Sequence, residues 1–159
     1  MRLSNQLENA VNEAVRRGAV WTEPGEKVAK FLRDVAKKYR IRLEGFSPKR
    51  VLSVGGGNEV GLQYFSSVRP LSAGWDEDLS SFRVQEILKR WGANTPEEVV
   101  RRSQKALDDD IERVRKEWEG VARKIESSYP PFKATVKAAK TAVGPVVNLE
   151  VRGRFAAWQ

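Results

Sequence analysis

The most regular stretch of this 159-residue sequence begins with Thr95-Pro96-Glu97-Glu98. Thr95 suits the N-cap of a helix, Pro96 its first turn, and Glu98 the position that closes a capping box. The predicted helix runs to about Ser127. Its apolar residues alternate spacings of four and three, as in a coiled-coil seam: Leu107, Ile111, Val114, Trp118, Val121 and Ile125. This helix therefore anchors the predicted fold, packed against other helices or against a second subunit.

Charged pairs along this helix and a second predicted helix before it support a helical body. Three pairs at i,i+4 spacing have the favourable order of acid before base: Asp109–Arg113, Glu112–Lys116 and Glu119–Arg123. Gly120 lies inside the helix, where it costs about 1 kcal/mol. Residues 81–92 predict a second helix, which Gly92 ends.

Two further helices are predicted among the first fifty residues. Residues 3–17 place apolar side chains at helical spacing and stop at Gly18. Thr22-Glu23-Pro24-Gly25 then forms a turn that starts the next helix. Its apolar stripe consists of Val28, Phe31, Leu32, Val35 and Ala36. The two helices together predict a basic helical arm.

The remaining segments are less regular. Val51-Leu52-Ser53-Val54 reads as a short strand inside an irregular connector. Pro130-Pro131 breaks the chain, residues 132–143 predict a short basic helix, and residues 146–152 alternate like a strand. Phe155 and Trp158 near the end suit a packing latch or a base-stacking platform.

The predicted fold class is therefore mainly α, with minor β segments near 51–54 and 146–152. It comprises a basic helical arm (1–50), an irregular connector (51–80), and a helical body with a basic C-terminal segment (81–159). These parts are expected to form one cooperative domain.

The formal net charge of +8 is unevenly distributed. Residues 1–50 hold 12 Lys/Arg against 6 Asp/Glu, and residues 130–159 hold 5 against 1. The segments 51–94 (4 against 5) and 95–129 (8 against 9) are nearly neutral. Clustered cations favour a polyanionic partner, because binding releases counterions from phosphates. An acidic protein surface and plain solubility are the alternatives.

The candidate nucleic-acid-binding residues are the cations of the two basic ends. They are Arg16, Arg17, Lys27, Lys30, Arg33, Lys37, Lys38, Arg40, Arg42, Lys49, Arg50, Lys133, Lys137 and Lys140. A merely solvated helix face is the alternative for the run from Lys27 to Arg42, which only Asp34 interrupts.

Composition excludes several kinds of chemistry. The chain has no His and no Cys, so a Ser-His-Asp triad, a Cys nucleophile and an ordinary zinc site are impossible. There is no Gly-Lys-Ser/Thr of a P-loop. Asp76-Glu77-Asp78 and Asp108-Asp109-Asp110 suit a solvated surface better than a metal site. We therefore expect no enzyme, no cofactor and no metal.

Two local motifs resemble known ligand-binding units. The segment Arg50–Gly57 resembles the glycine-rich loop of nucleotide or S-adenosylmethionine folds, but Glu59 and Gly61 depart from those patterns. Residues 87–100 are similar to helix-hairpin-helix DNA-binding units, with Asn94 at the second glycine position. A flexible loop and a plain helix junction are the respective alternatives.

The chain has one Met and is rich in Lys, Arg, Glu and Val, a composition common in proteins of hyperthermophiles. In size, charge, expected helical content and this composition, it resembles the DNA-wrapping coat proteins of filamentous or rod-shaped archaeal viruses. The resemblance implies a structural subunit that wraps nucleic acid and assembles with itself or a related subunit. It favours DNA over RNA as the partner, and RNA is the alternative. A phage head–tail or tail assembly protein and a small chromatin or regulatory protein are the alternatives. We expect no signal peptide and no membrane span, and a location in a virion or inside a cell.

Overall fold

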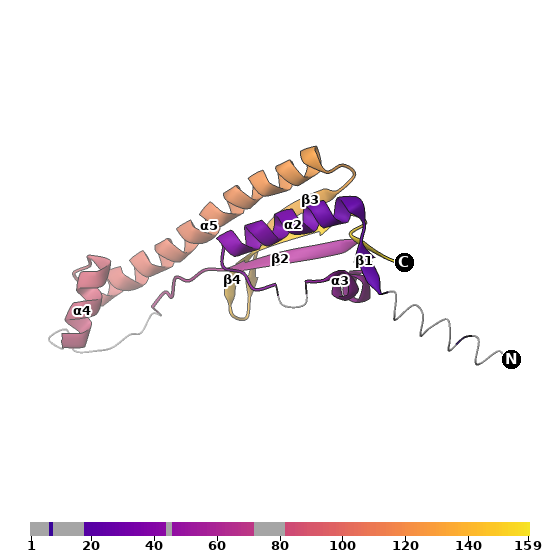
Figure 1. The fold of residues 1–159 in the computed structure, drawn as a ribbon. Helices are drawn as coiled ribbons and strands as arrows, with labels where there is room; N and C mark the ends of the chain where they lie inside the picture. Colours follow the sequence, from indigo (N-terminus) through magenta and orange to yellow (C-terminus); the bar gives the residue numbers. More distant parts are fainter. Residues whose placement is uncertain (1–6, 8–17, 44–45, 72–81) are drawn as a thin grey trace. The chain divides into compact units, whose positions relative to one another are not determined.

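The computed structural model describes residue 7 and residues 18–43, 46–71 and 82–159 (Figure 1). These residues form two compact units, each assembled from segments distant in sequence. The first unit consists of the described residues up to Tyr64 together with Trp118–Lys137 and Asn148–Gln159. The second unit consists of the described residues of Phe65–Glu117 and Ala138–Val147.

The fold is α+β, so the prediction of a mainly α protein is wrong. In the described ranges, four helices are accompanied by five strands in two antiparallel sheets. The smaller sheet pairs β1 (Ala19–Trp21) with β5 (Ala156–Trp158). The larger sheet has the order β2–β4–β3, formed by Glu59–Phe65, Gly144–Arg152 and Lys133–Thr141. The strands are thus a main component of the fold rather than minor segments.

Three of the predicted helices are confirmed. They are α2 (Glu23–Lys38), α4 (Phe82–Trp91) and α5 (Pro96–Ser128). Thr22 caps α2 by accepting a hydrogen bond from the N–H of Gly25. At the start of α5, the Thr95 hydroxyl accepts from the N–H of Glu98 at 3.2 Å. The predicted helix over 3–17 lies outside the described residues, apart from the helical Leu7.

The segment predicted as a strand at 51–54 belongs instead to helix α3 (Pro48–Gly55). Ser47 caps this helix through a hydrogen bond from the N–H of Arg50, and Pro48 occupies its first turn. Gly56 ends the helix in the left-handed conformation, at φ 62°. Local capping signals therefore override the β preference of the two valines.

The basic helix predicted over 132–143 is wrong as well, because Lys133–Thr141 is strand β3. A tight turn joins it to β4, where the Thr141 hydroxyl donates to the carbonyl of Gly144 at 2.8 Å. Gly144 has φ 115°, which favours glycine. Pairing with β4 thus decides the conformation of a segment whose lysine spacing imitates a helix. The predicted strand at 146–152 is confirmed within β4.

The core of the first unit lies where α2, α5 and the larger sheet meet (Figure 1). Tyr39, Tyr64 and Trp118 form mutual edge-on ring contacts, with centroids 5.5–6.2 Å apart. Trp118 is fully buried on α5, and Tyr64 lies on β2. Strand β2 alternates strictly between exposed and buried residues, so its even-numbered side chains face this core.

The smaller sheet ties the two ends of the described chain together. The backbone N–H of Thr22 donates to the carbonyl of Phe155 at 2.8 Å, next to the β1–β5 pairing. Phe155 is fully buried, and its ring meets Phe132 edge-on at 4.9 Å. Helix α3 packs against both strands of this sheet.

In the second unit, α4 packs against the first turn of α5. The buried side chains of this cluster are Val84, Leu88 and Val99. Arg102 donates to the carbonyls of Trp91 and Gly92, which fixes the junction between the helices. No helix in the described part of the chain is long and apolar enough to cross a lipid bilayer.

Candidate nucleic-acid interface

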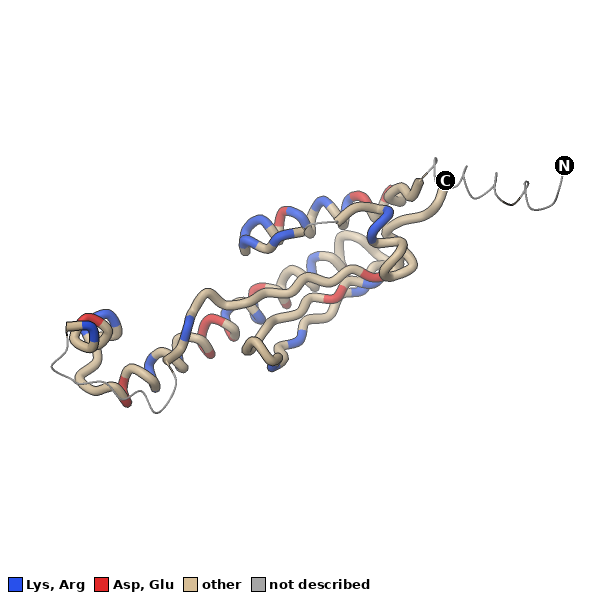
Figure 2. Tube along the Cα trace, turned by 90° about the horizontal axis from the view of Figure 1, so that it is seen from below, with Lys and Arg blue, Asp and Glu red and all other residues tan. Residues whose placement is uncertain are grey.

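Helix α2 separates its apolar and basic residues onto two faces. Its buried residues include Val28, Leu32 and Val35, which face the core. Its lysines are all exposed: Lys27, Lys30, Lys37 and Lys38. We call these four residues the α2 lysines. Figure 2 marks the positions of Lys and Arg along the trace of α2 in blue and those of Asp and Glu in red.

The charge of the α2 lysines is not neutralised locally. Within the described ranges, Lys27, Lys30 and Lys37 form no ion pair, and the ammonium of Lys38 lies 5.7 Å from the ring of Tyr39. The acidic residues of α2 are Glu23 and Glu26 in the first turn, where they favour the helix dipole, and Asp34. The α2 lysines therefore remain able to attract anions.

On helix α5, in contrast, the cations are paired with carboxylates. Lys105 pairs with Asp109 at 3.4 Å, and Arg113 pairs with Asp110 at 2.8 Å. Arg113 also reaches Glu117 at 3.2 Å. The predicted pair of Asp109 with Arg113 is therefore replaced by these three, because Asp109 pairs with Lys105 while Arg113 pairs with Asp110 and Glu117.

Charge also cancels around Glu112. Its carboxylate accepts from Arg115 at 2.6 Å and lies 3.9 Å from Lys116, which confirms the predicted pair with Lys116. The hydrogen bond from Arg115 lowers the pKa of Glu112. The central cations of α5 thus have carboxylate partners on their own helix.

Arg33 makes contacts within the fold, so it differs from the α2 lysines. Its guanidinium donates to the carbonyl of Phe46 at 3.1 Å. It also lies 5.6 Å from the ring centroid of Trp21 and 5.4 Å from that of Phe46. Arg33 thereby fastens Phe46 and Trp21 to α2, and its guanidinium is already engaged. Sequence alone could not separate it from its lysine neighbours.

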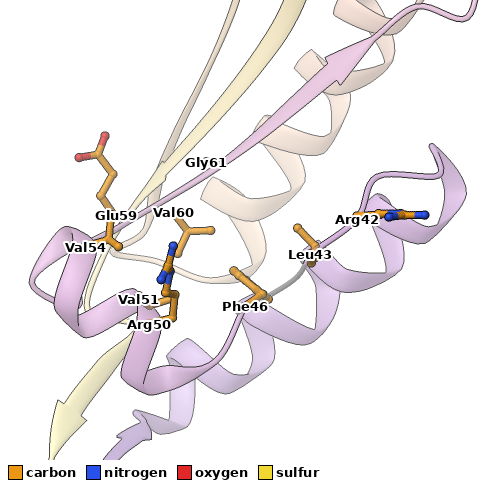
Figure 3. Close-up of a pocket in the computed structure, with 9 residues that line it drawn as sticks. All are labelled: Arg42, Leu43, Phe46, Arg50, Val51, Val54, Glu59, Val60 and Gly61. Atoms are coloured by element: carbon orange, nitrogen blue, oxygen red, sulfur yellow. The ribbon is translucent and has the colours of Figure 1, made fainter.

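Two of the next predicted cations, Arg42 and Arg50, line an open pocket of about 310 Å³ beside α3. Its apolar lining consists of Leu43, Phe46, Val51, Val54 and Val60. Figure 3 shows Arg50 among these side chains, whereas Arg42 points away from them. Glu59 also lines the pocket, so its charge is mixed. Arg40 and Lys49 are exposed nearby in the chain.

Two lysines of β3, Lys133 and Lys137, lie apart from the α2 lysines. Ala134 is buried, so by alternation Lys133 and Lys137 point away from the core on which α2 packs. Lys140 belongs to the second unit. Strand β3 is also an edge of its sheet, where lysines hinder pairing with other chains. Within the described residues of the first unit, the α2 lysines therefore do not form one continuous face with Lys133 and Lys137.

The structure nevertheless brings the two basic ends of the chain into one unit. The described residues of the first unit hold 15 Lys/Arg against 7 Asp/Glu, a net charge of +8. Those of the second unit hold 11 against 8, a net charge of +3. The β1–β5 pairing is what joins these ends. Arg16 and Arg17 lie outside the described residues.

Neither of the two ligand-binding motifs takes the expected form. The glycines that follow Arg50 come after a helix instead of a strand. At the junction of α4 and α5, the N–H of Asn94 donates to the Glu98 carboxylate at 2.9 Å. The N–H groups of Gly92 and Ala93 donate to carbonyls of α4. These groups are therefore not available to a phosphate, which favours a plain helix junction.

The acidic cluster on α5 is committed to neighbouring side chains. Asp108 accepts from Gln104, Asp109 pairs with Lys105, and Asp110 accepts from Ser66 at 2.7 Å. In the part of the chain that the structure describes, no group of acidic residues is arranged to hold a metal ion. Asp76-Glu77-Asp78 lies outside that part.

Comparisons with protein-family models, with curated proteins and with solved structures found no match to this chain. The function is therefore argued from the charges and contacts of the site.

Proposed function

We propose that this protein binds DNA through its phosphate backbone, in a structural rather than catalytic role. The observation that carries the proposal is the uncompensated positive charge of the first unit. Surface cations with carboxylate partners, like those of α5, gain little from a phosphate. Cations without partners release condensed counterions when they bind one, and this release drives binding without regard to sequence.

The dimensions of α2 suit this role. The α2 lysines extend over about 16 Å of helix at 1.5 Å per residue. Since a DNA strand advances about 3.4 Å per phosphate along its axis, this length can follow several consecutive phosphates. Lysine side chains are flexible, so they can adapt to the backbone without reading bases.

The proposal stops short of a coat-protein role. The resemblance to archaeal virus coat proteins depended partly on a mainly helical fold. The chain is 52% helical but also 24% strand, so that part of the resemblance is weaker. The remaining support for DNA binding is the distribution of charge, which is independent of the fold class.

The test measures binding of the protein to labelled duplex DNA by fluorescence anisotropy over a range of salt concentrations. Affinity should fall linearly with salt on logarithmic axes. The variant K30Q/K37Q should lower the slope by about 1.8, because each lysine on a phosphate contributes about 0.9. The matched control is K105Q/K116Q, which also reduces the net charge to +6 but removes lysines that have carboxylate partners.

The control variant should keep most of the wild-type slope. Equal losses in the two double variants would show that only net charge matters, which contradicts a defined interface. If the wild-type protein shows no salt-sensitive binding to DNA or RNA, the proposal fails.

A further inference from the structure

The two aromatic residues near the end of the sequence have opposite environments. Phe155 is fully buried against Phe132 and acts as a packing latch. Trp158 is 52% exposed, although it lies in strand β5. Among the described residues of the first unit, it is the large aromatic side chain that remains exposed.

A helix packed against the strand of Trp158 carries exposed cations. Trp158 pairs in register with Ala19 on β1. Helix α3, which packs against both β1 and β5, carries the exposed Lys49 and Arg50. The exposed Phe82 differs from this indole, because it lies in the second unit, whose described residues hold a net charge of +3 rather than +8.

We propose that Trp158 stacks on a base of single-stranded nucleic acid whose phosphates the cations of the first unit hold. This inference rests on the proposed function and specifies its substrate class. Every base presents an aromatic face, and proteins that bind single strands combine a basic surface with exposed aromatic side chains. A duplex keeps its bases stacked on one another, so it offers phosphates to the lysines but no free base to Trp158.

The test compares oligo(dT) with duplex DNA of the same length, using W158A, W158F and F82A. W158A should weaken binding of oligo(dT) about fivefold or more, and W158F should weaken it much less. Neither variant should change the affinity for duplex DNA. F82A removes an exposed aromatic side chain from the second unit, so it should bind both ligands like the wild type.

Tryptophan fluorescence supplies a second readout that does not require the alanine variant. Oligo(dT) should quench part of the emission of the wild-type protein, and this part should be missing in W158F. If W158A does not fold in a thermal unfolding experiment, the quenching in wild type and W158F decides the matter.

Several results would overturn the inference. Unchanged oligo(dT) binding by folded W158A, or equal quenching in W158F, excludes stacking on Trp158. A change of oligomeric state in W158A without nucleic acid, with oligo(dT) affinity intact, makes Trp158 a protein contact. After any of these results, duplex binding that depends on Lys30 and Lys37 would still support the proposed function. If the wild-type protein binds neither oligo(dT) nor duplex DNA, both the proposed function and the role of Trp158 are refuted.

Discussion

Ala19 and Trp158 are partners in a two-stranded antiparallel sheet, although they lie near opposite ends of the sequence. The pairing brings the basic beginning and the basic end of the chain into one unit. It also places Gly25 of α2 directly beside the backbone of Phe155. The β1–β5 pairing therefore both gathers the basic segments into the first unit and fixes the packing of α2 against Phe155.

Replacing Gly25 by alanine should destabilise the first unit. A Cβ at this position would collide with the backbone carbonyl of Phe155, and backbone cannot move aside as a flexible side chain can. We expect a loss of about 3 kcal/mol in the free energy of unfolding, measured in urea. The control is Gly120→Ala on α5, where a Cβ meets nothing within 4 Å. That variant should gain up to about 1 kcal/mol, so equal effects of the two substitutions would contradict the packing described.

Ser66 and Asp110 should be energetically coupled. Ser66 is buried, and its hydroxyl donates to the Asp110 carboxylate at 2.7 Å while accepting from the N–H of Val68 at 3.1 Å. Ser66→Ala should cost about 1–2 kcal/mol in the wild type and much less in an Asp110→Ala background. A double-mutant cycle of urea unfolding measures the coupling. Strictly additive effects would mean that the hydrogen bond contributes nothing.

The carboxyl of Glu112 should titrate below its ordinary pKa of 4.5, chiefly because it accepts a hydrogen bond from Arg115. The folded state then binds a proton less readily than the unfolded state. Its contribution to stability is therefore full above the unfolded pKa and is lost as the pH falls through the folded pKa. NMR titration should show the pKa of Glu112 rising in Arg115→Gln, and rising less in Lys116→Gln. A pKa unchanged by loss of Arg115 would refute the assigned cause.

The lysines of β3 should protect the edge of the larger sheet. A variant with Lys133, Lys137 and Lys140 changed to Thr keeps a strand-compatible sequence but removes charge from an exposed edge. We expect concentration-dependent aggregation without nucleic acid, measured by light scattering. The variant K27Q/K30Q/K37Q loses the same charge from helix α2 and should not aggregate. Similar aggregation of both variants would point to net charge alone.

Elements whose signals are local could be predicted from the sequence. The start of α5 was predicted because Thr95, Pro96 and Glu98 act within one turn, although the Glu98 carboxylate accepts from Asn94 rather than from Thr95. The prediction of a strand at 51–54 relied on its apolar residues alone and left out the capping signals Ser47 and Pro48. These signals are local too, so the helix was within reach of the sequence.

Elements that depend on distant partners could not be predicted in this way. Strand β3 has only one apolar residue larger than alanine, Val136, and its register with β4 decides which side chains face the core. For the candidate site, the sequence shows which residues are cations but not which of them are already engaged by other side chains. Arg33 is engaged by Trp21 and Phe46, which come from two other segments, so only the folded arrangement distinguishes it from Lys30.

The pairing of β1 with β5 also imposes an order on synthesis. The ribosome makes β1 and α2 early, whereas β5 follows all the other described elements. Until β5 emerges, Gly25 and the neighbouring apolar face of α2 lack part of their cover, and a nascent chain must keep this surface from premature association. Contacts so distant in sequence also slow folding, because a long loop must close before they form. The first unit is therefore expected to mature only after translation has reached β5, and chaperones that shield apolar segments should engage the chain before then.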